Sequence, residues 1–238
     1  QMSREGFFYA GMGSLAALNQ STPGIIHTNR SGSPLSTLSD LDIVSGPLGS
    51  AAPEGASRDW NLHQIGMAIG TVEFGGRAAV VHGYGVWTEA WAIDEQVDVI
   101  DLGLMAKRTG YDSVPIVTLT GERENDNRLV REGLMATGLK TVVLRGKGVL
   151  AIAPTLFEAW NNIAELERAC QVLSLRLTMD AAYGEYSEEQ WTENQSEVVE
   201  DDYVSESFNH GPGPSGPGPG GPGPSGPGPG GPGPSGPG

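Results

Sequence analysis

The chain has 238 residues and a net charge of -15, and 38% of its residues are hydrophobic, which is enough for one ordinary domain with a core. The acidic balance argues against nucleic acid, whose phosphates need a basic footprint, and against anionic membrane surfaces. No apolar run reaches the roughly 18 residues needed to cross a bilayer, so no membrane insertion is expected, and the single cysteine excludes an internal disulfide.

Composition divides the chain into three parts. Residues 1–184 have the mixed pattern of a globular domain, and residues 185–210 form an acidic linker with nine carboxylates and no Lys or Arg. Residues 211–238 repeat a ten-residue Gly/Pro/Ser unit 2.8 times, a composition that favours polyproline II conformation. We therefore expect one domain followed by a linker and an extended tail.

The first half of the domain contains short strands and one helix. Residues 24–28 and 41–46 are predicted strands on either side of a Ser/Gly/Pro-rich loop. Residues 59–70 have apolar side chains at helical spacing, and residues 78–87 begin as a buried strand that ends in a glycine-rich exit. The sequence thus alternates element types without a strict βαβ period.

The second half is more regular. Residues 126–138 predict an amphipathic helix stopped by glycine, and residues 140–153 predict two β-runs around a Gly-Lys-Gly break. Residues 155–177 predict the longest helix, with Thr155 and Glu158 as a capping box and the cysteine as a core thiol. Together these elements predict an α/β fold in layers around a mixed or largely antiparallel sheet.

One histidine stands at the end of the buried strand "AVVHGYGVW" (residues 79–87). Side chains two positions apart on a strand face the same way, which is why two histidines in that spacing can chelate a metal. Here His82 is followed at the second position by Tyr84. The stretch is therefore either a former metal site or a buried histidine held by hydrogen bonds.

Several segments carry a resemblance to one family. The segment "TVVLRGKGVLAIAPTLFEAWNNIAELERACQV" (141–172) is similar to a strand with "LRNHGVL" followed by "TLEEA" and a helix with acidic pairs. The segment "AAVVHGYGVWTEAWA" (78–92) is similar to "AVVHTHSPYATALA", and "ASRDWNLHQIG" (56–66) to "PSSEWPLHLAIY". Over about residues 11–177 the chain resembles the class II aldolase/adducin family. The resemblance implies a three-layer α/β/α fold around a mixed, mostly antiparallel sheet, usually in a cyclic tetramer.

The resemblance also implies a divalent metal held by three histidines, with a glutamate nearby as acid/base. His82 matches the first histidine, whereas Tyr84 and Lys147 occupy the other two positions and Asp59 stands in place of the glutamate. A lone imidazole beside an ammonium is a poor site for a dication, because the ammonium adds repulsion and no lone pair. We therefore expect no metal and no other cofactor.

The phosphate-binding loops implied by the resemblance are altered too. The family's "GNLS" corresponds to residues 13–16, and its "TPSG" to residues 28–32. Arg30, Ser31 and Gly32 are candidates for an anion site formed by a guanidinium and backbone N–H groups. The alternative is a polar surface turn.

Two function hypotheses follow. The first is a non-catalytic pseudoenzyme that assembles with itself into a homo-oligomer or filament, with the Gly/Pro tail contributing contacts between subunits. The second is a metal-independent lyase or isomerase for a small carbonyl compound or phosphorylated sugar. In it Lys147 would form a Schiff base while His82, Tyr84 and Asp59 exchange protons.

The compartment is left open by the sequence. Three Asn-x-Ser/Thr sequons, at Asn19, Asn29 and Asn194, together with the Gly/Pro tail favour an extracellular or cell-surface location, where these asparagines would be glycosylated. The family resemblance favours the cytoplasm instead.

Overall fold

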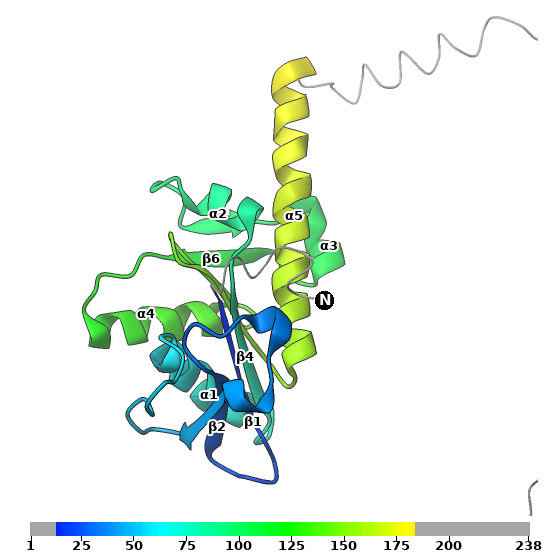
Figure 1. Cartoon of the computed structure of the whole chain (residues 1–238). Helices are drawn as coiled ribbons and strands as arrows, with labels where there is room; N and C mark the ends of the chain where they lie inside the picture. The colour runs from blue at the N-terminus through cyan, green and yellow to red at the C-terminus, as the bar shows by residue number, and fades with distance from the viewer. Residues whose placement is uncertain (1–12, 184–238) are drawn as a thin grey trace, which may run out of the picture. The chain divides into compact units, whose positions relative to one another are not determined.

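The computed structural model describes residues 13–183, which lie within one compact unit, Gln1–Tyr186. Eight strands form one sheet in the order β3-β2-β1-β4-β8-β7-β6-β5 (Figure 1). Neighbouring strands are antiparallel except for β6 and β7, which are parallel. The predicted linker and tail lie outside the described residues, so their boundaries stay predictions.

The strands are short and come from the whole length of the domain. They are β1 (Ser14–Leu18), β2 (Ile25–Asn29), β3 (Ile43–Pro47), β4 (Ala78–Gly83), β5 (Val99–Asp101), β6 (Ser113–Val117), β7 (Thr141–Leu144) and β8 (Gly148–Ala153). The fully buried β4, β7 and β8 stand together in the middle of the sheet.

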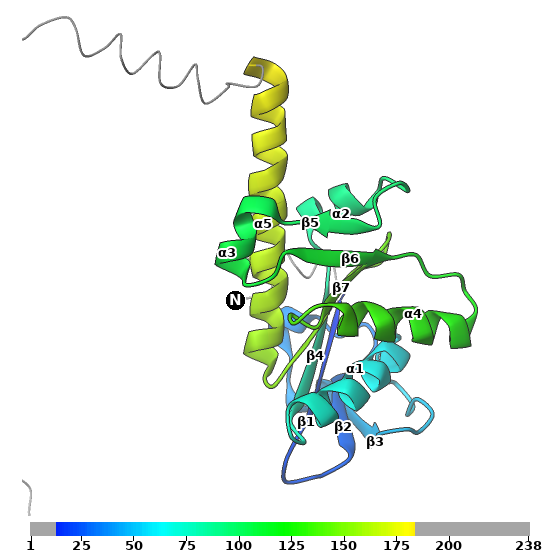
Figure 2. The ribbon, with the colours of Figure 1, turned by 180° about the vertical axis from the view of Figure 1, so that it is seen from behind.

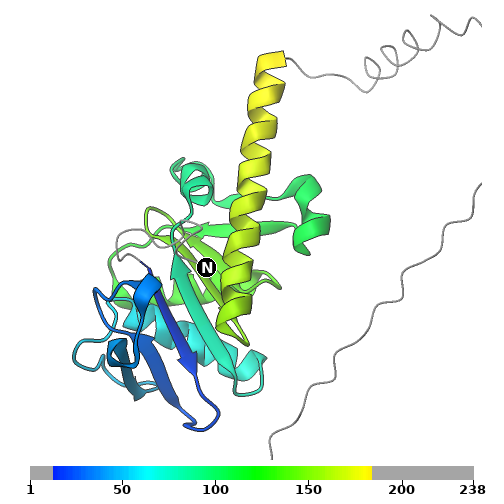
Figure 3. The ribbon, with the colours of Figure 1, turned by 45° about the vertical axis from the view of Figure 1, so that its right-hand side comes forward.

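Helices cover both faces of the sheet (Figures 2 and 3). On one face lie α1 (Trp60–Glu73) and α4 (Arg123–Ala136), and on the other lie α2 (Val86–Ala92), α5 (Leu156–Tyr183) and the short α3 (Ala106–Thr109). Three 3₁₀ turns, η1 (Leu35–Thr37), η2 (Asp40–Asp42) and η3 (Gly103–Met105), complete the elements. Within the described residues, no helix is long and apolar enough to cross a membrane.

Alternation along the central strands divides the interior into two cores. Val80, Val142 and Ile152 pack in one core with α1 and α4, which we call the α1 face. Their sequence neighbours Val81 and Val143 pack in the other core with α5, which we call the α5 face. Period-two burial on both sides is what a strand between two helical layers requires, so the predicted three-layer α/β/α fold is confirmed.

Helix α1 lies unusually close to the sheet. A side chain at Gly66 would place its Cβ 2.6 Å from Val80 Cγ2 and 2.7 Å from Ile152 Cγ2, so only glycine fits at this crossing. The close approach packs the middle of α1 directly on β4 and β8.

The longest helix begins as expected and runs further. Thr155 Oγ accepts a hydrogen bond from the Glu158 backbone N–H (3.2 Å) and donates to the Glu158 carboxylate (2.8 Å), and α5 continues to Tyr183 rather than ending at residue 177. Sequence reasoning missed α2, which begins where a strand exit was expected. The carboxylate of Glu167 accepts hydrogen bonds from the backbone N–H groups of Trp87 (2.8 Å) and Thr88 (2.9 Å), so the start of α2 depends on a residue about 80 positions away.

Candidate functional site: a buried polar network beside a cleft

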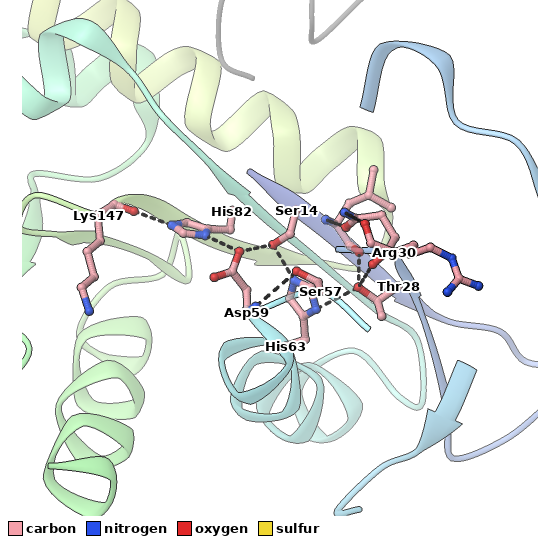
Figure 4. A network of polar contacts seen from close by, with 10 residues as sticks. Ser14, Thr28, Arg30, Ser57, Asp59, His63, His82 and Lys147 are labelled. Atoms are coloured by element: carbon pink, nitrogen blue, oxygen red, sulfur yellow. Dashed lines mark hydrogen bonds and ion pairs between the residues drawn. The ribbon is translucent and has the colours of Figure 1, made fainter. Parts of the chain in front are cut away.

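Three neighbouring strands each present one polar side chain to the α1 face. Ser14, Thr28 and His82 lie two residues from the apolar core residues of that face on β1, β2 and β4, and all three are buried. The sheet register places Ser14 opposite His82. Asp59 and His63 enter from the first turn of α1, so five polar side chains meet at this point (Figure 4).

Asp59 stands at the centre of the network. Its Oδ2 accepts a hydrogen bond from Ser14 Oγ at 2.7 Å and lies 2.9 Å from His82 Nδ1. Burial pushes the pKa of Asp59 upward, but the hydrogen bond and charge of His82, together with the Ser14 hydroxyl, outweigh it and hold the pKa well below its ordinary value. Asp59 is therefore a carboxylate at neutral pH.

The other ring nitrogen of His82 is also engaged. Nε2 lies 2.5 Å from the backbone carbonyl oxygen of Lys147, in the turn between β7 and β8. Gly146 and Gly148 flank that residue with positive φ angles of 66° and 89°, which are backbone conformations that suit glycine. The turn thereby aims a carbonyl at the imidazole.

The ammonium of Lys147 does not join the network. Its side chain is exposed and points away from His82 (Figure 4). The pKa of Asp126 is lowered mainly by a hydrogen bond from the Thr120 backbone N–H, and in smaller part by the positive charge of Lys147. Of the expected set, the structure brings His82, Tyr84 and Asp59 together, whereas Lys147 meets His82 through its backbone carbonyl and not through its ammonium.

His63 closes the inner end of the network. Its Nε2 lies 2.8 Å from Ser14 Oγ and its Nδ1 lies 3.1 Å from Thr28 Oγ1. The side chain is fully buried, and burial lowers the pKa of His63 to about 4. The ring is neutral at physiological pH, so His63 supports the site rather than holding a charge there.

A cleft of about 400 Å³ opens beside Asp59. Its lining residues are small or polar: Gly13, Asn29, Ser31, Gly32, Ser57, Arg58, Asp59 and Tyr84. The Tyr84 ring centroid lies 5.3 Å from that of His82, and burial raises the pKa of its hydroxyl. The cleft thus offers hydroxyl donors, one guanidinium and one carboxylate.

Only two of the three expected anion-binding residues lie at the cleft. Ser31 and Gly32 line the cleft, whereas the guanidinium of Arg30 lies over Gly55, which has no side chain to exclude it. Arg58 supplies the cleft's cation instead. Sequence reasoning missed Ser57 and Arg58 as site residues, although both immediately precede Asp59 in the segment that carried the family resemblance.

The predicted sequons also differ in accessibility. Asn29 is 3% exposed, and its amide accepts from the Leu15 backbone N–H (2.9 Å) and donates to the Arg30 carbonyl (3.2 Å), so a glycan could not reach it in the folded domain. Asn19 is exposed in the turn after β1. Asn194 lies outside the described residues.

The residues present do not fit a divalent metal. His82 has no ring nitrogen left for one, since Nδ1 faces the Asp59 carboxylate and Nε2 faces the Lys147 carbonyl. Across residues 13–183, no group of three or more His, Cys, Asp or Glu side chains is arranged to hold a metal.

Comparison with known proteins agrees with this fold. The L-fuculose-1-phosphate aldolase of Thermus thermophilus is 23% identical, with a TM-score of 0.61 over 74% of this chain and 90% of that chain. A sugar-phosphate aldolase of Thermotoga maritima is 14% identical, with a TM-score of 0.62 over 75% of this chain and 90% of that one. The L-fuculose 1-phosphate aldolase of Glaciozyma antarctica is 18% identical, with a TM-score of 0.53 over 83% of this chain and 76% of that one.

Likeness at these identities shows the fold alone, and no curated protein matches the chain. The family model described as "Class II Aldolase and Adducin N-terminal domain" matches residues 1–174. That match covers most of the chain, including every strand and all but the end of α5. The chain therefore belongs to the class II aldolase and adducin N-terminal domain family.

Proposed function

We propose that this chain is a non-catalytic member of its family that acts as a subunit of a homo-oligomeric or filamentous assembly. The observation that carries the proposal is that both ring nitrogens of His82 have hydrogen-bond partners, Asp59 on one side and the Lys147 carbonyl on the other. In that state the histidine can neither bind a metal nor exchange a proton with a substrate, because both of its nitrogens already have partners. Tyr84 at the second position supplies no replacement imidazole.

The rival hypothesis is a metal-independent lyase or isomerase. It needs a nucleophilic amine in the cleft with a lowered pKa. Lys147 is exposed and its side chain points away from His82 (Figure 4), so its amine does not face the buried network. Asp59 and Tyr84 do line the cleft, so two of the three expected proton-transfer residues face it, whereas neither His82 nor Lys147 is among the residues that line it.

The assembly half of the proposal rests on the C-terminal repeat. Residues 211–238 would reach about 90 Å as polyproline II at ~3.1 Å per residue, which is far enough to cross a neighbouring subunit. Several weak contacts along such a tail add up through effective concentration. A contact between unlike surfaces that does not close into a ring produces a filament.

The test compares the full chain with a chain that ends at His210. Mass is measured by light scattering and shape by negative-stain microscopy. We expect the full chain to form larger assemblies than the truncated chain, which retains the whole described domain. Equal masses for the two chains would contradict a role for the tail.

Activity is tested separately on the full chain. A panel of sugar phosphates and small aldehydes is assayed with and without Zn²⁺, and borohydride is added to trap any Schiff base. We expect no turnover and no adduct on Lys147. Reproducible cleavage, or a borohydride-fixed adduct on that lysine, would favour the lyase hypothesis.

An extracellular or cell-surface location is part of the proposal. The exposed sequon at Asn19 supports it, because a glycan can reach this asparagine. Peptide mass spectrometry of the protein from its natural source should find a glycan on Asn19 and none on buried Asn29. A completely unmodified Asn19 would favour the cytoplasmic alternative.

A further inference from the structure

We propose that a built-in ion pair fills the place where a divalent metal would sit, with His82 carrying a hydrogen on both ring nitrogens. In this arrangement the imidazolium is the cation of the site, Asp59 is its counter-ion, and the Lys147 carbonyl is its second acceptor. The pair excludes a divalent metal even when a second histidine is supplied. This inference concerns His82 alone and does not depend on whether the chain assembles.

The first step is the chemistry of the two acceptors. A carbonyl oxygen has no hydrogen to give, so the 2.5 Å contact with Lys147 requires a hydrogen on His82 Nε2. Asp59 Oδ2 already accepts the Ser14 hydroxyl and faces His82 Nδ1 at 2.9 Å. A carboxylate that accepts two hydrogen bonds is favoured over its protonated form, so the shared hydrogen belongs to Nδ1.

The second step is burial. The His82 side chain is 3% exposed, and that of Asp59 is 25% exposed. A charge in such a place is stable only when it is paired and its remaining hydrogens have acceptors. His82 meets both conditions, because its two N–H groups meet one carboxylate and one carbonyl.

The third step is the rigidity of the carbonyl. The Lys147 backbone N–H donates to the Leu144 carbonyl at 2.8 Å, which closes the β7–β8 turn. The next residue, Gly148, packs so tightly on the Gly83 carbonyl that no Cβ would fit there. The acceptor is therefore held against His82 by the backbone, and a metal would have to displace the turn as well as a hydrogen.

The direct test is NMR of the full chain labelled with ¹⁵N-histidine, near neutral pH. We expect His82 to show two ring N–H groups, both bonded and slow to exchange with water. In Asp59→Asn the counter-ion is lost, and His82 should keep only the Nε2 hydrogen. A His82 ring with one bare nitrogen in the unmodified chain would overturn the proposal.

The second test supplies the missing histidine. Tyr84→His rebuilds the H-x-H spacing, and zinc retained after desalting is measured by elemental analysis. We expect less than about 0.1 zinc per chain, because neither nitrogen of His82 is free. Stoichiometric zinc in this variant would overturn the proposal.

The matched control adds a histidine elsewhere. Residue 45 lies directly opposite His27 in the β2–β3 register, so Ser45→His places two histidines side by side. His27 Nδ1 contacts the Ser45 hydroxyl, which this variant removes, rather than a carboxylate or a carbonyl. The zinc binding of Ser45→His should exceed that of Tyr84→His, which shows that the assay detects a two-histidine pair. If Tyr84→His does not fold, the NMR experiment on the unmodified chain still decides the question.

Discussion

The two faces of the central sheet are made by the same strands and filled in different ways. On the α1 face, Ser14, Thr28, His63 and His82 are buried among the apolar side chains and bonded to one another or to Asp59. On the α5 face, the helix contributes Ile163, Leu166, Ala169 and Cys170, all packed against strand residues.

The two faces should therefore respond differently to pH and to small shifts of their atoms. The α5 face is held by apolar area, which is insensitive to pH and tolerant of small shifts. The α1 face combines apolar area with buried hydrogen bonds and one ion pair, so its stability depends also on protonation and on distances of a few tenths of an ångström. Burial raises the pKa of the Cys170 thiol to about 12, which makes it another inert member of the α5 face, as expected.

The largest expected effect is on the α5 face. Leu166→Ala removes a fully buried side chain from the centre of α5 and should lower the free energy of unfolding by about 3 kcal/mol. Because no titrating group is removed, the loss should be the same near pH 5 and near pH 7.5. Urea unfolding of the full chain at both pH values measures it, and a loss that changes with pH would contradict the distinction between the two faces.

Asp59→Asn tests the α1 face with an almost equal effect. It removes the counter-ion of His82, which then keeps only its Nε2 hydrogen, and loss of the ion pair should lower the free energy of unfolding by about 2–3 kcal/mol near neutral pH. The sign follows from its depressed pKa: the stabilisation is present above the unfolded value of 3.8 and is lost as the pH falls below it. The control is Asp40→Asn, which removes an exposed carboxylate and should change the free energy of unfolding by less than about 0.5 kcal/mol.

The next effect is a pH dependence. The folded pKa of His63 is about 4, below its ordinary 6.5, so the unfolded chain binds the extra proton first as the solution is acidified. The contribution of His63 to stability should therefore fall by about 2 kcal/mol between pH 7.5 and pH 5. His63→Gln should flatten this slope, whereas His27→Gln on β2 should leave it unchanged. Parallel slopes for the unmodified chain and His63→Gln would refute the role of His63.

Much of this fold was predictable because its signals are local. Apolar periodicity identified β2, β3, β4, β7, β8 and the three long helices, since each buries a continuous face. The start of α2 was not predictable, because Glu167 caps it from a distant helix. The strand β1 was missed as well, because its sequence SLAAL is dominated by small residues with weak strand propensity.

Of the candidate site, the sequence could predict some of the side chains but not the backbone groups and loop paths that complete it. Family resemblance pointed to Asp59, His82 and Tyr84, and the structure places Asp59 and Tyr84 on the cleft wall with His82 buried next to both. The exchange of Arg30 for Arg58 depends on which way a loop turns over Gly55, which no residue pattern encodes. The decisive acceptor at His82 is a backbone carbonyl, and every residue has one.

Two substitutions distinguish the side chain of Lys147 from its backbone carbonyl, and the first of them should have the least effect. Lys147→Ala removes an exposed ammonium and keeps the carbonyl, so the free energy of unfolding should change by less than about 0.5 kcal/mol at any pH between 5 and 7.5. Gly148→Ala keeps the ammonium but forces the turn away from Gly83, and it should cost about 1–3 kcal/mol. Urea unfolding of the two variants side by side measures both. A loss above about 1 kcal/mol in Lys147→Ala would show that the ammonium stabilises the α1 face, and the α1 face would then depend on a surface charge as well as on its buried network.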